Sequence, residues 1–299
     1  MNVVITGANS AVGQAILRCG PKQKDSPNTF VAAVRSARAA EQIRPQLTNG
    51  TAVALISYDD PASLDAAFQG VSAVIHLTGI LVERADSTYE QANVATTRSV
   101  VGAAKRCGVR KIVLVSATGA DEKSSNRYYR TKGQAEALVR ASGISYTVLR
   151  APLLLGSGTA GAAALKRNAS QGKARLIGGG RNLQQPLHVD DLARGALAAT
   201  QPSVANNLTL DLIGPVSLPD RELLERAARF LGREVRIGSI PKFLVSIMLA
   251  IRQLFSGPGF SRDALEVVTA DTRLNPQPAA SELGIQLRGI DEMIKDSVG

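Results

Sequence analysis

TGANSAVG, Thr6 to Gly13, follows the apolar run Asn2 to Ile5 and leads into the helical pattern AVGQAILRC. This order of strand, glycine turn and helix is typical of a dinucleotide-binding segment. Gly7 permits a tight reversal of the chain, and Gly13 allows the helix and the strand to pack closely. The free N–H groups at the helix start suit a pyrophosphate. We therefore expect cofactor contacts from Gly7, Asn9, Ser10, Ala11, Val12 and Gly13.

The glycine pattern departs from GxGxxG, because Ser10 stands where a middle glycine is common, and alone it leaves a chance turn as the alternative. A second apolar strand, Thr29 to Val34, ends at Arg35, about twenty residues after the turn. An acid at that position would accept the 2′-hydroxyl of NAD, whereas a guanidinium suits a 2′-phosphate. With Ser36 and Arg38 supporting Arg35, we expect a preference for NADP(H), with NAD(H) as the other option. The alternative is that both arginines are solvated surface cations.

The composition is that of a globular protein with one or two domains, because the chain has 299 residues, 44% of them hydrophobic and 20% charged. A net charge of +10 and a pI near 9.9 suit an anionic partner. However, the basic residues are scattered, and only 4% of the chain is aromatic. These features favour an anionic cofactor or a membrane surface and exclude a nucleic acid.

The cysteines and histidines indicate neither a disulfide nor a metal site. Cys19 and Cys107 lack CxxC spacing and lie in helical, apolar stretches, which predicts small buried side chains in a reducing compartment. His76 and His188 are the two histidines, far apart and without a neighbouring cysteine, so we expect no metal.

A strand that starts at residue 2 leaves no signal peptide, so we expect a cytoplasmic protein. The longest apolar stretch, Phe243 to Ile251, is far shorter than the roughly 20 residues that span a bilayer. Wound as a helix, residues 242–256 are hydrophobic over most of the circumference. This predicts packing in the core, a subunit contact or shallow insertion at the inner face of a membrane.

Strand and helix patterns alternate after the glycine turn, which predicts a doubly wound parallel α/β Rossmann sheet with a smaller C-terminal substrate lobe. We expect residues 1–155 to form the NAD(P)-binding domain and residues 156–299 mainly a substrate or interaction lobe, with residues 186–213 returning to the first domain. Glycine-rich residues 158–164 and 178–180 are expected to form loops near the substrate. The expected strands are 29–34, 52–56, 73–76, 111–115 and 146–149, and the expected helices are 37–47, 61–68, 87–107 and 132–141.

Several motifs resemble the short-chain dehydrogenase/reductase superfamily in its extended and atypical branches: SAVIHLTG (72–79), YEQANVATT (89–97), GVRKIVLVSATGA (108–120), VLRAPLLLG (148–156) and PLHVDDLA (186–193). The resemblance implies that Leu77, Thr78 and Gly79, with His76, lie beside the ribose and nicotinamide of the cofactor, and that Asn93 is the structural asparagine. It also implies that Asp59 contacts the adenine, although a helix N-cap before Pro61 is an alternative for this acid.

The C-terminal sequence GPGFSRDALEVVTADTRLNP (257–276), followed by SELGI, resembles that of the nucleotide-binding accessory subunit of respiratory complex I and its bacterial relatives. Members of that branch bind NADPH without an established turnover. The resemblance therefore implies cofactor binding more firmly than catalysis, and it adds a respiratory complex to the partners that residues 242–256 would contact.

Tyr128 and Lys132, spaced YxxxK, would lie on one face of a helix. In the superfamily the tyrosine transfers a proton at the substrate oxygen, and the lysine holds the nicotinamide ribose and lowers the pKa of the tyrosine. Ser116 would orient the substrate carbonyl. Thr118 is the alternative, because in relatives the catalytic hydroxyl can lie one or two positions along this segment, and Ala117 occupies one of those positions. The spacing from Ser116 to Tyr128 is shorter than in the classical branch, and Tyr129 is a second tyrosine that could point inward.

His188, Asp190 and Asp191 lie together, but in the family this segment stabilises the loop beneath the substrate lobe, so we expect a structural role. His76 has no nucleophile or metal partner nearby, and we expect it to line the cofactor site or to be buried.

The sequence thus predicts an NADP(H)-binding oxidoreductase that passes hydride between NADPH and a carbonyl or quinone-like substrate. The alternative is a non-catalytic NADPH-binding scaffold or redox sensor that docks on a membrane respiratory or quinone-related complex.

Overall fold

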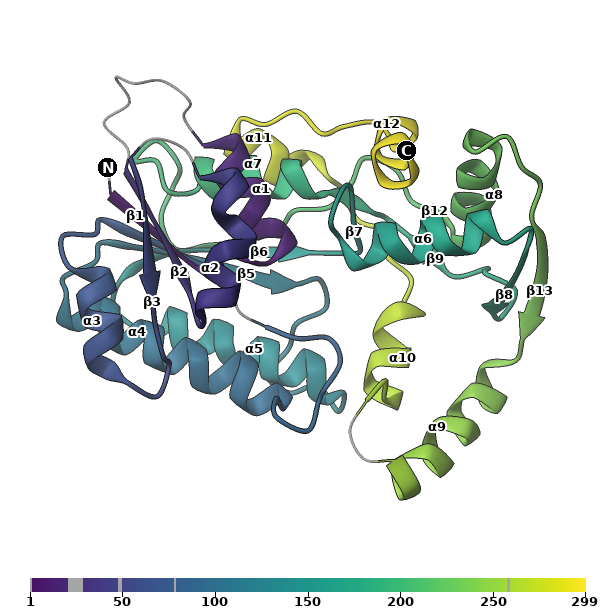
Figure 1. The fold of residues 1–299 in the computed structure, drawn as a ribbon, viewed down its shortest axis with the longest axis horizontal. Helices are drawn as coiled ribbons and strands as arrows, with labels where there is room; N and C mark the ends of the chain where they lie inside the picture. The colour runs from purple at the N-terminus through teal and green to yellow at the C-terminus, as the bar shows by residue number, and fades with distance from the viewer. Residues whose placement is uncertain (1, 21–28, 48–49, 78, 257–258) are drawn as a thin grey trace.

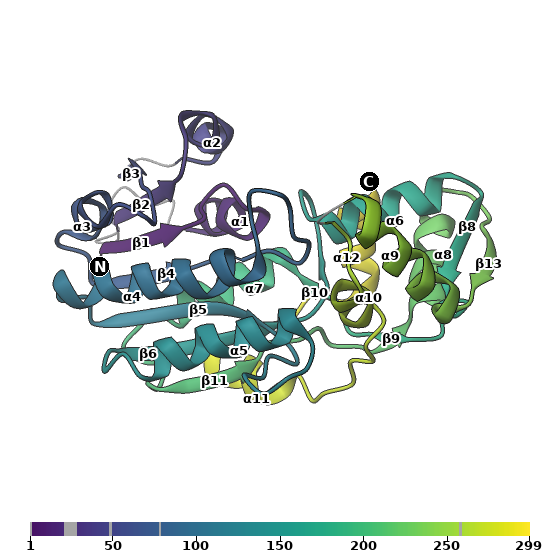
Figure 2. The same cartoon turned by 90° about the horizontal axis from the view of Figure 1, so that it is seen from below.

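The computed structural model describes the chain except residues 1, 21–28, 48–49, 78 and 257–258, and from 250 to 256 it describes the backbone only. Two lobes lie side by side along the long axis of the molecule (Figure 1, Figure 2). The first is built on a large sheet, and the second is mainly helical. Among the described helices, none has the length and apolar character needed to cross a bilayer.

The first lobe contains a parallel sheet of seven strands in the order β11, β6, β5, β4, β1, β2, β3. The order reverses between β1 and β4, which is the switch point where open α/β sheets bind ligands at the carboxyl ends of their strands. The predicted doubly wound α/β fold is confirmed. The strands are β1 (Asn2–Thr6), β2 (Thr29–Val34), β3 (Thr51–Leu55), β4 (Ala73–His76), β5 (Lys111–Ala117), β6 (Ser145–Ala151) and β11 (Leu208–Asp211).

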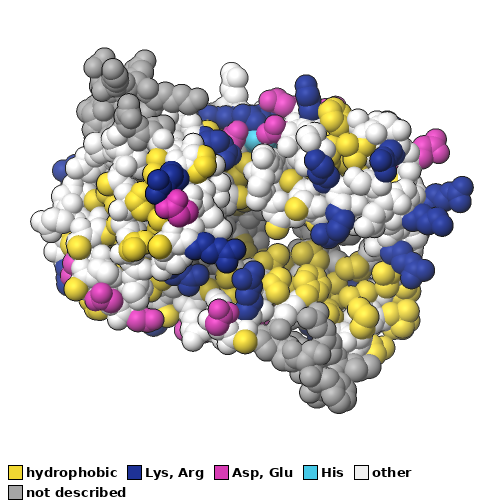
Figure 3. Space-filling view, in the orientation of Figure 1, with side chains coloured by type: hydrophobic (Ala, Val, Ile, Leu, Met, Phe, Trp, Pro, Cys, Tyr) yellow, Lys and Arg dark blue, Asp and Glu magenta, His cyan; other side chains and the backbone are white. Residues whose placement is uncertain are grey.

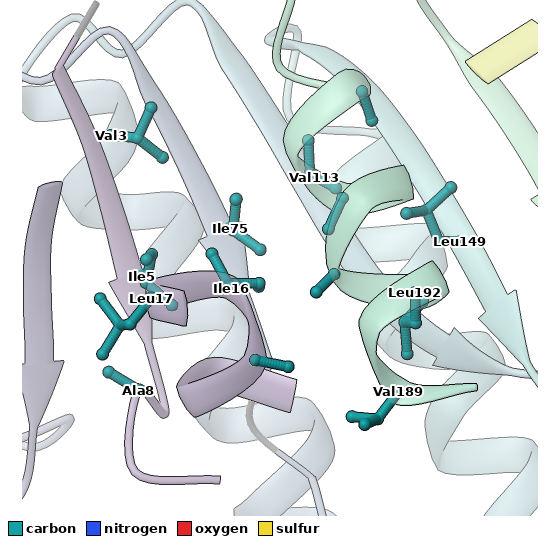
Figure 4. Close-up of a cluster of buried hydrophobic side chains, with 14 of the residues drawn as sticks. Val3, Ile5, Ala8, Ile16, Leu17, Ile75, Val113, Leu149, Val189 and Leu192 are labelled. Carbon is teal, nitrogen blue, oxygen red and sulfur yellow. The ribbon is translucent and has the colours of Figure 1, made fainter. Parts of the chain in front are cut away.

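Helices cover both faces of this sheet, since successive residues of a buried strand point to opposite faces and both must be shielded from water. Ile5 of β1 belongs to the core on one face, shown in Figure 4, and its neighbour Val4 belongs to the core on the other. The first core lies under α1 (Ala11–Cys19), α2 (Ala37–Ile43), α7 (Val189–Ala198) and α11 (Gln277–Leu283), and the second lies under α3 (Pro61–Phe68), α4 (Thr96–Arg106) and α5 (Arg127–Arg140).

Three helices differ from their predicted bounds. The helix expected at 87–107 begins with one π-helical segment, η2 (Glu90–Ala95), before α4 continues it. The helix expected from 132 begins five residues earlier, because the Asn126 side chain accepts hydrogen bonds from the backbone N–H groups of Tyr128 and Tyr129. Tyr128 and Lys132 therefore both lie on α5. The helix predicted over 37–47 ends as a 3-10 turn, η1 (Arg44–Gln46).

The second lobe has its own apolar core, in which Leu165, Leu224 and Met293 from three different helices meet. The prediction of a loop at 158–164 is wrong, since the Thr159 side chain caps the start of α6 by accepting from Ala162 N–H. The elements outside the large sheet are β7 (Leu154–Leu155), α6 (Ala160–Ser170), β8 (Lys173–Ile177), β9 (Leu183–Gln184), β10 (Leu187–His188), β12 (Leu218–Pro219), α8 (Asp220–Phe230), β13 (Arg236–Ile240), α9 (Lys242–Ser256), α10 (Arg262–Val268) and α12 (Ile290–Val298).

Candidate functional site

The glycine turn after β1 has the geometry that its sequence predicts. Gly7 has φ +75°, in the left-handed region that glycine adopts without strain. A Cβ on Gly13 would lie 2.5 Å from the Ala8 carbonyl oxygen, so only glycine allows α1 to approach the turn this closely. Ser10 caps α1, its hydroxyl accepting from Gly13 N–H at 3.1 Å. The serine that breaks the GxGxxG pattern therefore stabilises the helix start.

The start of α1 faces a cavity of about 530 Å³. The first N–H groups of a helix have no partner within the helix, and Ser10 takes only that of Gly13, which leaves those of Ala11 and Val12 for a ligand. The cavity is lined from four strand ends, and among its lining residues are Gly7, Asn9, Ser10, Arg35, Tyr58, Asp59, Leu77, Gly79 and Thr96. Of the other predicted cofactor residues, Thr78 lies outside the described residues.

Arg35 lies at the wall of this cavity, at the end of β2, with its side chain exposed. Within the described part of the chain neither Arg35 nor Arg38 forms an ion pair, so both guanidinium groups can receive an anion. The Ser36 hydroxyl accepts a hydrogen bond from Ala39 N–H and so caps the start of α2. Ser36 and Arg38 do not line the cavity among the described residues, and their contact with a cofactor stays a prediction.

Asp59 lines the same cavity, next to Tyr58. The alternative in which Asp59 caps the following helix is wrong, because Asp60 is the N-cap of α3 and accepts from Ala62 N–H at 3.0 Å. The Asp59 carboxylate is therefore not needed for the helix start.

His76, at the end of β4, is buried in a chain of hydroxyl groups. Thr97 donates to the Asn93 carbonyl at 2.6 Å, so its oxygen accepts from His76 Nε2, and His76 Nδ1 accepts from Thr6 at 2.6 Å. Burial, with a smaller effect of Lys132, lowers the pKa of His76 to about 3. Both ring nitrogens of the neutral histidine have partners within the protein, and these contacts order the carboxyl end of β4.

Lys132, on α5, lies beside Gly79, which lines the nucleotide cavity. A Cβ on Gly79 would lie 2.6 Å from the Lys132 ammonium and 2.9 Å from the Asn93 side-chain oxygen, so these polar groups border the backbone of Gly79. The ammonium contacts the Val115 carbonyl at 3.5 Å and has no ion pair among the described residues. Burial lowers its pKa to about 8, against a smaller opposing effect of Glu136. Asn93 Oδ1 is buried and unpaired.

A second cavity, of about 550 Å³, lies between the two lobes, and Figure 3 shows hydrophobic side chains in the hollow there. Its walls combine the carboxyl ends of β5 and β6 with α6, α8 and α10. Leu81 lines it, two residues after Gly79 of the nucleotide cavity, so the segment after β4 borders both spaces. Most of the lining is apolar, including Leu153, Leu155, Leu165, Leu176, Ile177, Leu223, Leu224, Phe260, Val267 and Val268.

Tyr128 lines this second cavity, and no described residue accepts from or donates to its hydroxyl. Its ring packs edge-on against Tyr89 and Tyr129, with centroids 5.8 and 5.6 Å away. Burial, followed by the effects of Tyr129 and Tyr89, raises the pKa of Tyr128 well above its ordinary value. The expected lowering of this pKa by Lys132 is not found, because desolvation disfavours the phenolate. Tyr129 also lines the cavity, so both tyrosines stay candidates by position.

Ser116 and Thr118 are placed differently. The Ser116 hydroxyl donates to the Glu136 carboxylate at 2.7 Å, and Ser116 does not line the cavity among the described residues. Thr118 does line it, and its buried hydroxyl has no hydrogen-bond partner. A buried hydroxyl without a partner costs free energy that a bound polar group would recover. By geometry, the rival Thr118 is therefore better placed than Ser116 to meet a substrate oxygen.

Glu136 is a residue that the sequence analysis missed. Its fully buried carboxylate accepts from Ser116, from Arg140 and twice from Arg150. The available signal was its position four residues after Lys132, one turn further along the same helix face.

Asn126 was missed as well. Besides capping α5, it donates through Nδ2 to the Asp263 carbonyl and to Glu266 Oε2 of α10, at 3.1 and 2.8 Å. The start of the helix that carries Tyr128 is therefore tied to the second lobe. No local sequence pattern marks such a contact.

His188, Asp190 and Asp296 offer ligand atoms that lie close together. The Arg288 guanidinium lies among them, 3.1 Å from His188 Nε2 and 3.2 Å from Asp190 Oδ2. An arginine already supplies the positive charge, and the cluster joins the start of α7 to α12. Asp191 is buried and accepts from Arg288 N–H and from Arg194, which is a structural arrangement. Cys19 and Cys107 form no disulfide and are partly buried.

These residues fit a nicotinamide dinucleotide. The glycine cradle and the helix start suit a pyrophosphate, and Arg35 and Asp59 lie along the same cavity. Lys132 and the unpaired Asn93 oxygen lie beside Gly79 of this cavity, where a ribose hydroxyl would satisfy both. The fold and the site together define an α/β protein that binds a dinucleotide.

Comparison with known proteins gives the family. A family model described as NAD(P)H-binding matches residues 7–179, more than half of the chain. The chain belongs to this NAD(P)H-binding family, and it is of the extended short-chain dehydrogenase/reductase kind. The resemblance drawn from its motifs is confirmed.

Two curated relatives and one solved structure illustrate this. Ceramide reductase of Caulobacter vibrioides is 24% identical over 241 residues, covering 80% of this chain and 73% of that protein. NADH dehydrogenase [ubiquinone] 1 alpha subcomplex subunit 9 of Arabidopsis thaliana is 27% identical over 228 residues, covering 71% of this chain but only 56% of that protein. An NADPH-dependent quinone oxidoreductase from Escherichia coli shares the fold, with a TM-score of 0.72 at 20% identity and 98% coverage of both chains.

Proposed function

We propose that this protein is an NADP(H)-dependent reductase of a large apolar carbonyl or quinone-like substrate. The observation that carries the proposal is the meeting of two cavities at the segment after β4. Gly79, beside Lys132, and Ile80 line the nucleotide cavity, and the next residue, Leu81, lines the apolar cavity, with the unpaired hydroxyl of Tyr128 in its wall. A nicotinamide held at the first cavity and a substrate in the second would touch at this place.

The proposed role of Tyr128 is to donate its phenolic proton to the substrate oxygen. NADPH, when bound, supplies a hydride to the carbonyl carbon. The hydroxyl, whose pKa is raised by burial, is protonated at neutral pH, as a proton donor must be. The alcohol leaves with the proton, and Tyr128 regains one from water.

Thr118 is the group that we propose to orient the substrate oxygen. Its hydroxyl is buried at the cavity and unpaired, whereas that of Ser116 is bound to Glu136. Lys132 would hold the ribose through its ammonium, which lies beside Gly79. Arg35 would bind the 2′-phosphate and so favour NADP(H) over NAD(H), because its guanidinium lines the cavity without an ion pair among the described residues.

The substrate class follows from the lining of the second cavity. About ten aliphatic and aromatic side chains line a space of about 550 Å³, a size typical of sites for drug-sized ligands. Relatives named as a ceramide reductase and as a ketoreductase of a farnesyl dihydroquinoline oxide support a substrate with a long apolar part. A few polar side chains, among them Arg167, Asn168 and Arg175, would contact a polar end.

The test is a titration of cofactor-stripped protein with NADPH and NADH, followed by absorbance of the reduced nicotinamide against a panel of apolar ketones, long-chain acyl carbonyls and quinones. Tight NADPH binding with substrate-dependent oxidation is the expected result. Failure to bind either nucleotide would overturn the proposal.

The second candidate is a non-catalytic NADPH-binding scaffold or redox sensor on a membrane respiratory complex. The observation that favours it is the similarity to the complex I subunit over 71% of this chain. Tight NADPH binding without oxidation of any substrate in the panel would favour the scaffold. The Tyr128→Phe variant separates the two, since a scaffold is indifferent to the loss of that hydroxyl.

A further inference from the structure

Exposed apolar side chains are concentrated on one helix of the second lobe. Of the nine exposed large hydrophobic residues in the described part of the chain, four lie within six consecutive positions of α9. They form one face, at spacings of one and four residues, and their exposed fractions are 48 to 64%. We call this the α9 face; it consists of Phe243, Leu244, Ile247 and Met248.

The other side of α9 is anchored. Val245 and Leu249 are buried against Leu265 of α10, with Phe260 and Ile177 packed around them. Phe260 and Ile177 also line the cavity between the lobes, so α9 backs the wall of that cavity. Helix α9 is held in place on one side, and its apolar outer side has no cover among the described residues.

The charges around the α9 face are positive. Lys242 begins the helix, and Arg262 Nε donates to the Ser246 carbonyl at 3.4 Å, which places a guanidinium beside the face. The neighbouring β8–β13 ribbon adds exposed Lys173, Arg175 and Arg236. Neither β8, β13 nor α9 contains an acidic residue, and these five cations form no ion pair in the part of the chain that the structure describes. The two acids of α10, Asp263 and Glu266, accept hydrogen bonds from the start of α5, from Arg127 N–H and from Asn126 Nδ2.

We infer that the α9 face docks on the surface of a membrane that contains anionic lipids, with Lys242 and Arg262 at the headgroups. An apolar helix face flanked by lysine and arginine is the arrangement that inserts between headgroups. The whole chain, at +10, is drawn to the same surface. A second copy would fit poorly, because a two-fold contact across this face would bring like charges together.

Figure 3 shows the yellow side chains of this region next to the hydrophobic hollow between the lobes, and Figure 1 places α9 at the outer edge of the second lobe. Docking in this orientation brings the wall of the apolar cavity to the lipid surface. The docking itself does not depend on the reaction. Only its use, which is delivery of an apolar carbonyl from the membrane, rests on the proposed function.

The experiment is co-sedimentation of the 299-residue chain with phosphatidylcholine vesicles, with and without phosphatidylglycerol, at low and high salt. The double variant Phe243→Ser/Met248→Ser tests the face, and Lys242→Gln/Arg262→Gln tests the charges. The matched control is Phe230→Ser/Leu274→Ser, which removes two comparably exposed apolar side chains outside α9. NADPH affinity, measured for every variant, shows that each one is folded.

We expect the parent and the control to bind anionic vesicles in a salt-sensitive way. The face variant should lose at least about tenfold in affinity, and the charge variant about fivefold for each cation. Absence of vesicle binding, or equal binding by the face variant, would overturn the inference. So would self-association that the face variant abolishes while no lipid binds. Vesicle binding without turnover leaves the docking standing and rejects only the reductase.

Discussion

The Ser116 hydroxyl donates a 2.7 Å hydrogen bond to the Glu136 carboxylate, inside a cluster that Arg140 and Arg150 complete. Glu136 is fully buried, and its charge is balanced by both guanidinium groups. The end of β5 is therefore fastened to α5, the helix that carries Tyr128 and Lys132. The serine that the superfamily uses at the substrate has a structural contact in this chain.

Thr118→Val is expected to lower kcat/KM about 10- to 100-fold, because it removes the hydroxyl proposed to orient the substrate and keeps the size of the side chain. The NADPH dissociation constant should not change. Ser116→Ala is the comparison: it should cost about 1–3 kcal/mol of unfolding free energy, by leaving Glu136 short of a donor, with a smaller effect on turnover. Steady-state kinetics and urea unfolding of both variants check this, and the reverse pattern would return the catalytic role to Ser116.

Tyr128→Phe should reduce kcat by about 10²- to 10⁴-fold, since the ring and its packing stay and only the proton donor is lost. NADPH binding should be intact. Tyr129→Phe is the matched control from the same helix turn and should keep most of the activity. Single-turnover measurement of nicotinamide absorbance separates the chemical step from binding. An active Tyr128→Phe enzyme would refute the proposed role.

Arg35→Ala should weaken NADPH binding at least about tenfold and change NADH binding little, because only NADPH carries the 2′-phosphate that a guanidinium holds. Arg38→Ala shows whether the second arginine shares the contact. Calorimetric titration of each variant with both cofactors is the measurement. An equal loss for NADPH and NADH would mean that Arg35 does not read the phosphate.

The pKa of Lys132, lowered by burial to about 8 from an ordinary 10.5, predicts a pH dependence of stability. Between these two values the unfolded chain binds a proton that the folded chain does not, so stability rises with pH across this window. Below about pH 8 the cost of burying the ammonium is present in full. The stability of the parent relative to Lys132→Met should therefore increase by about 2 kcal/mol from pH 7 to pH 9.5.

Urea unfolding of the cofactor-free parent and of Lys132→Met at these two pH values gives the free energy of unfolding of each. Subtracting the value of the variant from that of the parent removes the contribution of every other titrating group. The affinity for NADPH should change in the opposite direction, because the proposed ribose contact is made by the charged form. A flat difference would show that the Lys132 ammonium is solvated in the folded protein.

Several residues that the sequence predicts to contact the cofactor, among them Gly7, Ser10 and Arg35, line one cavity, and the signals that mark them in the sequence are local. The left-handed backbone at residue 7 and the close packing at residue 13 both require glycine, and Arg35 directly follows a strand. Each depends on a few neighbouring residues. The alternation of strand and helix was sufficient for the fold for the same reason.

The substrate half was harder to predict, because it depends on contacts between distant residues. The proposal of Thr118 in place of Ser116 depends on the contact of Ser116 with Glu136, twenty residues away, and the early start of α5 depends on the Asn126 cap. The glycine-rich sequence at 158–164 predicted a loop, but α6 begins there, because the N-cap of Thr159 outweighs the weak helix propensity of glycine. The exposure of the α9 face depends on tertiary packing alone.

The last strand of the large sheet, β11, has a consequence for how this protein can be divided. After β6 the chain builds α6 and β8 in the second lobe, returns for α7 and β11, leaves again for α8 to α10, returns for α11 and ends in α12. No single cut in the gene therefore separates one lobe from the other. A fragment that ends after β6 would leave an unpaired sheet edge and a bare apolar face where α7 packs, which invites aggregation. Exchange of the second lobe for that of a relative would therefore require the replacement of several separate segments of the chain at once.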